Sequence, residues 1–200
     1  MNIEELANLY DPDDEKGSML RVFQKCCPYK IVGALGEYLE PLHNETLNQI
    51  SETLGIKVQK CILVYGLIPY LGMTNPTAMP IIVVHPNIWN LPIEQTPVKS
   101  FQSLLSHEYG HRIFDDRFRD SVDELERSKM LTGAHETGEG FAFWLQRTIM
   151  GTELTEEVLS PFQESGQDIM QIKKVYHQLL KQDPRELMKG LNFYHAICRK

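Results

Sequence analysis

The chain carries the stretch VKSFQSLLSHEYGHRIF from Val98 to Phe114, whose centre reads HEYGH from His107 to His111. Thr96 and Pro97 precede it, a pair typical of a helix N-cap followed by proline in the first turn. Apolar residues then recur at helical spacing through the stretch. The sequence therefore predicts one long helix here, and the rest of the domain is organised around it.

Two imidazoles four residues apart lie on one face of such a helix, so His107 and His111 can bind the same metal ion. Glu108 directly follows the first histidine, which places its carboxylate beside the metal rather than on it. From there Glu108 can take a proton from a water molecule on the metal. The spacing predicts a zinc site with Glu108 as the catalytic base. The alternative is an amphipathic helix with two histidines satisfied by ordinary packing.

In this H-E-x-x-H pattern the chain resembles the zincin metallopeptidases, and the resemblance covers roughly residues 78–150. A catalytic zinc has three protein ligands and one open position, so a third ligand is needed. The metzincin arrangement would place a further histidine or aspartate six residues after His111, with a glycine between them. Arg117 and Phe114 stand at those two positions, which argues against that arrangement.

The gluzincin-type arrangement takes its third ligand from a glutamate on a later helix. The segment TGEGFAFWL, from Thr137 to Leu145, resembles that helix, and the resemblance implies Glu139 as the third zinc ligand. We expect the glycines on both sides of Glu139 to let the two helices approach closely. Glu136 is the alternative ligand, and Glu139 could instead be a first-turn acid that complements the helix dipole. The pattern is also similar to that of small intracellular zincins that cleave repressors, and of growth-regulating plant peptidases.

Zincins usually add a donor that stabilises the oxyanion of the tetrahedral intermediate. The histidines and tyrosines outside the motif form the pool for this role, and none is favoured singly: His85, His135, Tyr176, His177, Tyr194 and His195. Asp115 and Asp116 are possible partners of the ligand histidines, although a solvated acidic face is the simpler interpretation.

Upstream of the motif, residues 1–55 are predicted to be helical, with Asn44 capping a helix that Gly55 ends. Short β-branched runs follow, of which Cys61–Tyr65 and Ala78–Val84 are the clearest predicted strands. Pro80 favours an edge position or the start of a strand for the second run. We expect this run to border the zinc cleft and to pair with an extended substrate.

Downstream of the motif, capping residues, glycines and prolines predict further helices. They cover residues 121–133, 139–150, 156–160, 167–181 and 184–197. No repeat or linker interrupts residues 1–200, so one domain is expected, with residues 56–200 holding the sheet, the motif helix and the C-terminal helices. The predicted fold class is α+β: a mostly helical zincin-like domain with a small sheet beside the H-E-x-x-H helix.

The composition is that of an ordinary globular protein, with 42% hydrophobic and 24% charged residues among 200. A net charge of −7 argues against a nucleic-acid partner, because no basic surplus can neutralise phosphates. The four cysteines fit no zinc-binding spacing and are expected to be reduced thiols. No apolar run reaches the roughly 20 residues that span a bilayer. The acidic beginning lacks a signal peptide, so we expect a cytoplasmic protein without a membrane partner, with export by an unmarked route left open.

The sequence thus predicts a zinc-dependent metallopeptidase with a protein or peptide substrate, and it predicts no oligomeric state. Two alternatives belong to other classes. One is a catalytically silent zincin-like interaction module, and the other is a metal-dependent hydrolase of a non-peptide amide.

Overall fold

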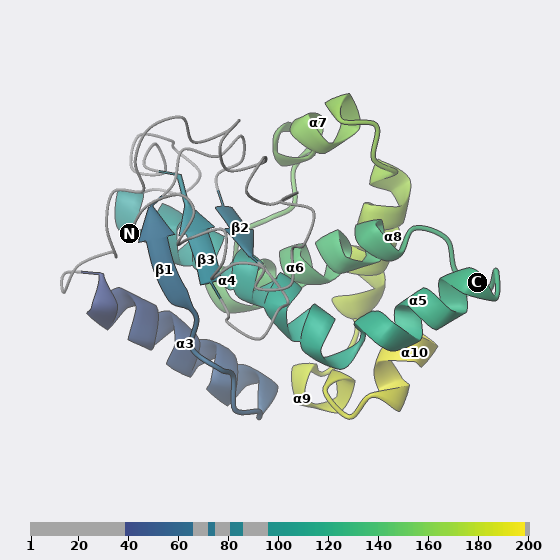
Figure 1. Cartoon of the computed structure of the whole chain (residues 1–200), viewed down its shortest axis with the longest axis horizontal. Coiled ribbons are helices and arrows are strands. Elements are labelled where there is room, and N and C mark those ends of the chain that lie inside the picture. The colour runs from purple at the N-terminus through teal and green to yellow at the C-terminus, as the bar shows by residue number, and fades with distance from the viewer. Residues whose placement is uncertain (1–38, 66–71, 75–80, 86–95, 199–200) are drawn as a thin grey trace, which may run out of the picture.

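A computed structural model of the chain describes residues 39–65, 72–74, 81–85 and 96–198 (Figure 1). The described part is mostly helical, as expected. The elements follow in the order α3 (Glu40–Leu54), β1 (Ile62–Tyr65), β2 (Gly72–Thr74), β3 (Ile81–Val84), α4 (Pro97–Arg117), α5 (Arg119–Arg127), α6 (Ala134–Met150), α7 (Glu156–Glu164), α8 (Ile169–Leu179), α9 (Pro184–Leu187) and α10 (Leu191–Ile197). In this described part no helix is both long and apolar enough to cross a membrane.

The three short strands form one sheet in the order β1-β3-β2. β3 runs parallel to β1, with Ile62 opposite Ile81, and antiparallel to β2, with Gly72 opposite Val84. The edge position expected for the run ending at Val84 is therefore wrong, because its buried Val83 and Val84 belong to the central strand. β3 begins at Ile81, the residue after Pro80, which agrees with the alternative that the proline marks the start of the strand. The strand that packs on α4 at the edge of the sheet is β2, which the sequence pattern did not indicate.

Helices α4 and α6 form the centre of the molecule. In Figure 1 the strands overlap the left part of α4, α3 lies to the lower left, α7 lies above α6, and α8 lies to its right. A Cβ added at Gly110 of α4 would lie only 2.6 Å from the Cα of Ala142 in α6. The missing side chain at Gly110 therefore lets the two backbones nearly touch.

The core beneath this helix pair is aromatic. Phe114 and Phe118, at the end of α4, contact Phe141 of α6 and Phe193 of α10, and the Phe118 and Phe193 rings stack with centroids 4.1 Å apart. All four side chains are at most 2% exposed. Burial of this size fixes the C-terminal half of α4 against the helices that follow it.

Several helices begin or end at other residues than the sequence predicted. α3 begins at Glu40, so Asn44 lies inside it rather than capping it, whereas Gly55 ends it in a left-handed conformation as expected. α5 begins at Arg119, so Ser121 is not its cap. α7 continues through Pro161 to Glu164. The predicted last helix is two helices, because Gly190 separates α9 from α10 with a φ of 77°.

Candidate metal centre

Helix α4 presents the two motif histidines side by side. Its first turn is capped as predicted, because the Thr96 side chain accepts a hydrogen bond from the Lys99 amide. The Nε2 atoms of His107 and His111 lie 3.1 Å apart, and the rings meet edge to face. The two side chains are 12% and 17% exposed, so the pair faces a largely enclosed space.

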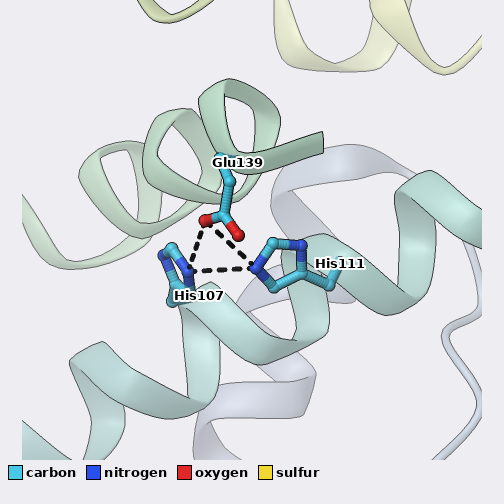
Figure 2. Close-up of side chains that lie close together, drawn as sticks. All are labelled: His107, His111 and Glu139. Atoms are coloured by element: carbon cyan, nitrogen blue, oxygen red, sulfur yellow. Dashed lines mark hydrogen bonds and ion pairs between the residues drawn. The ribbon is translucent and has the colours of Figure 1, made fainter. Parts of the chain in front are cut away.

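Helix α6 brings Glu139 to the same point (Figure 2). Its Oε2 lies 3.5 Å from the Nε2 of His107 and 3.5 Å from that of His111. Figure 2 shows the carboxylate hanging from α6 over the gap between the two imidazoles. One ligand atom from each residue therefore belongs to a single group that could hold a metal ion.

The triangle of ligand atoms has the size that zinc requires. Bonds of about 2.0–2.1 Å in a tetrahedral arrangement hold ligand atoms about 3.3 Å apart. The three measured separations, 3.1, 3.5 and 3.5 Å, lie around that value. Oε2 of Glu139 is buried and has no hydrogen-bond partner among the described residues, which suits an oxygen whose partner is a cation. Two imidazoles and a carboxylate are also a donor set typical of zinc.

The histidines and the carboxylate of the triangle shift one another's pKa values. Burial alone would lower the pKa of His111, but the neighbouring Glu139 carboxylate outweighs it and raises this pKa to about 9. Burial alone would raise the pKa of Glu139, yet the two histidines hold it far below the usual range. Without a metal, the imidazoles and the carboxylate therefore favour each other's charged forms, so a cation that binds here competes with a proton.

Glu108 lies beside the triangle and under strand β2. Glu108 is 4% exposed, and a Cβ added at Gly72 would lie 2.5 Å from the Oε1 of Glu108. Burial raises the pKa of Glu108, and the neighbouring histidines only partly offset that effect. A carboxylate with a raised pKa is better suited to accept a proton than an exposed one.

Glu136, the alternative third ligand, turns away from the triangle. Its Oε1 accepts a hydrogen bond from the Asp168 amide at the start of α8, with a length of 3.4 Å. Its Oε2 lies near Gly133, where an added Cβ would be 2.8 Å away. Because α6 begins at Ala134, Glu139 lies in its second turn and not at its start as the sequence suggested.

Of the two glycines that flank Glu139, only Gly138 faces α4 as predicted. A Cβ at Gly140 would meet Val175 of α8 at 2.7 Å, so Gly140 faces away from α4. A Cβ at Gly138 would meet the Phe114 ring of α4 at 3.3 Å, which is closer than an ordinary van der Waals contact. α4 and α6 approach more closely at Gly110, inside the motif itself, where an added Cβ would lie nearest to a backbone atom and not to a side chain.

The two aspartates after the motif have other partners. Asp115 accepts hydrogen bonds from Arg119, and Asp116 forms an ion pair with Arg112 at 3.0 Å. Both pairs span four residues of helix. Among the described residues, neither aspartate accepts a hydrogen bond from His107 or His111.

Of the six candidate oxyanion donors, His135 has a recorded contact with the triangle. Its Nε2 lies 3.8 Å from the Oε1 of Glu139. Tyr176 reaches Glu153 and stacks edge-on with His177, while Tyr194 packs against Phe118. His195 lies on α10 beside Tyr194, and His85 follows β3.

Tyr109, the first variable position of the motif, was also missed from the sequence. Its hydroxyl lies 2.5 Å from the Nε2 of His43 in α3 and accepts a hydrogen bond from the Cys61 amide. Tyr109 therefore attaches the motif helix to α3 and to the start of β1. A fully buried tyrosine needs a polar partner, but nothing in the sequence indicates which one.

Comparison with known proteins identifies no relative. No family model, curated protein or solved structure matches the chain. Its function therefore has to be inferred from the side chains that meet around His107, His111 and Glu139.

Proposed function

We propose that the protein is a zinc-dependent metallopeptidase with a zincin-like α+β domain, in which His107, His111 and Glu139 bind one zinc ion. The observation that carries the proposal is the triangle of two Nε2 atoms and one carboxylate oxygen, 3.1–3.5 Å apart, with Glu108 beside it. Its dimensions suit a three-ligand site that leaves a fourth position for water.

When bound, zinc lowers the pKa of water to about 7 and polarises a carbonyl group. Glu108 acts as general base, accepting a proton from the attacking water at its carboxylate. Glu108 then returns this proton to the nitrogen of the leaving amine, which completes hydrolysis of the amide bond. Strand β2 covers Glu108 and limits the access of bulk water to its carboxylate.

The burial of Glu108 favours catalysis over a silent interaction module. A buried carboxylate is costly unless it is paired, and among the described residues none forms a hydrogen bond or ion pair with Glu108. Such a cost is expected where a side chain serves chemistry and not stability.

The position of β2 favours an extended peptide as substrate. Within the described three-stranded sheet β2 lies at an edge, and Gly72 lies directly against Glu108. Peptides commonly add to a sheet edge through main-chain hydrogen bonds, and this edge would hold such a peptide beside the base. This role replaces the one expected for β3.

The experiment that tests the proposal is hydrolysis of a peptide library by the zinc-loaded protein and by Glu108→Gln. The variant keeps the size of the side chain and the metal ligands, so zinc binding should persist. Hydrolysis should fall by about 10²–10⁴-fold, because the proton acceptor is lost.

Equal cleavage by Glu108→Gln and parent would contradict the assignment of the base. A zinc-loaded parent that cleaves no peptide but hydrolyses small acyl-amides would be a hydrolase of non-peptide amides. Retention of zinc with no hydrolysis of either kind would favour the interaction module.

A further inference from the structure

The two oxygens of the Glu139 carboxylate face different partners. Oε2 lies 3.5 Å from each motif histidine, whereas Oε1 lies 3.8 Å from the Nε2 of His135. The Glu139 side chain is 9% exposed and that of His135 is 61% exposed. His135 thus reaches the outer side of the carboxylate from one turn earlier on the same helix.

The turn of α6 that bears His135 is itself anchored. The Glu126 Oε1 of α5 accepts hydrogen bonds from the amides of Gly133 and Ala134, both 3.0 Å long. These amides would otherwise lack partners at the start of the helix. The Thr137 hydroxyl donates to the Gly133 carbonyl and closes the same turn. The backbone that places the His135 ring over Glu139 is therefore held by a neighbouring helix.

A glutamate ligand needs such a partner because its carboxylate can rotate about its last torsion. Rotation of Glu139 would exchange the two oxygens or turn both away from the histidines. A partner that attracts Oε1 leaves one orientation preferred, with Oε2 directed at the metal. Residues that hold ligands in this way contribute to metal affinity without contacting the metal.

We propose that His135 is a positioning residue whose Nε2, 3.8 Å from Oε1 of Glu139, attracts that oxygen and so keeps Oε2 directed at the cation. This inference rests on the proposed zinc site and deepens it. The N–H of a neutral imidazole already provides this attraction, so no change of charge is required. His135 lies outside the group of three residues whose ligand atoms lie within 4.8 Å of one another.

The test is zinc affinity, measured by competition with a chromophoric chelator on metal-free protein to which Zn²⁺ is returned. His135→Ala should weaken binding by about 10–100-fold, the usual cost of losing such a partner. His135→Gln, whose amide N–H groups can also attract that oxygen, should bind nearly as well as the parent. His177→Ala removes an exposed histidine of α8 and should match the parent.

Two further measurements show whether a loss of zinc affinity in His135→Ala comes from the position of Glu139 or from another cause. The urea midpoint of the metal-free protein should be the same for His135→Ala and parent, because the lost side chain is mostly exposed. In a Glu139→Ala background, His135→Ala should cost no further affinity, because its effect passes through that carboxylate.

Undiminished zinc affinity in His135→Ala would overturn the inference while leaving the proposed zinc site intact. A loss that persists in the Glu139→Ala background would make His135 a metal ligand and would also overturn it. Failure of the parent to bind Zn²⁺ would overturn the proposed function, and the inference with it.

Discussion

Glu136 and Glu139 show how two identical side chains on one helix are assigned different tasks by their neighbours. Three residues apart on α6, they point to different helices: Glu139 meets the histidines of α4, and Glu136 accepts a hydrogen bond from the amide of Asp168, the N-cap of α8. The sequence left both as candidate ligands, because spacing alone does not say which neighbour a helix face will meet.

At this scale the first prediction compares two single substitutions. Glu139→Ala should lose zinc at chelator concentrations that the parent withstands, because one of three ligands is gone. Glu136→Ala should keep its zinc, with only a small loss of stability from the contact with α8. Dialysis against graded chelator followed by metal analysis measures both. The opposite pattern would assign the ligand to Glu136.

Among the helices and strands, the sequence predicted correctly those ends that depend on residues close by in the chain, such as a capping side chain or a terminal glycine. The predicted Thr96 cap of α4 is present, and Gly55 ends α3 as predicted. The predictions failed where the start of a helix or the presence of a strand depends on a contact with another element. The start of α6 is fixed by Glu126, seven residues before Gly133, and β2 exists because it pairs with β3.

The helix pair α4–α6 yields the second prediction. Alanine normally favours a helix over glycine by about 1 kcal/mol. Gly110→Ala should nevertheless destabilise the metal-free protein by about 1–3 kcal/mol, because its Cβ would meet the backbone of Ala142 at 2.6 Å.

Gly138→Ala is the matched control for that substitution. Its Cβ would meet side chains and no backbone, the Phe114 ring at 3.3 Å and the Arg119 guanidinium at 3.7 Å, so its effect on the free energy of unfolding should be smaller. Urea unfolding of both variants checks the difference. A stabilised Gly110→Ala would mean that α4 and α6 are not as close as described.

For the whole molecule, His43 connects stability to pH. It is 2% exposed, its Nε2 lies 2.5 Å from the Tyr109 hydroxyl, and burial lowers its pKa to about 4. In the unfolded chain a histidine titrates near 6.5. Between these values the unfolded state binds the proton and the folded state does not.

The third prediction follows from that difference. The contribution of His43 is fully present above about pH 6.5 and is lost as the pH falls towards 4, by on the order of 3 kcal/mol. His43→Gln keeps a polar partner for Tyr109 but cannot titrate, so its stability should fall less over this range. Urea unfolding of metal-free protein at several pH values measures the slopes. His177→Gln, an exposed control, should retain the parental slope, and an unchanged slope in His43→Gln would contradict the prediction.

Zinc content most directly tests the claim that α4 and α6 together form a metal centre. Protein purified without chelators should contain about one zinc per chain by elemental analysis, and His107→Ala prepared in parallel should contain almost none. Absence of stoichiometric metal from the parent, or equal zinc in parent and variant, would contradict the assignment of His107, His111 and Glu139 as the zinc ligands.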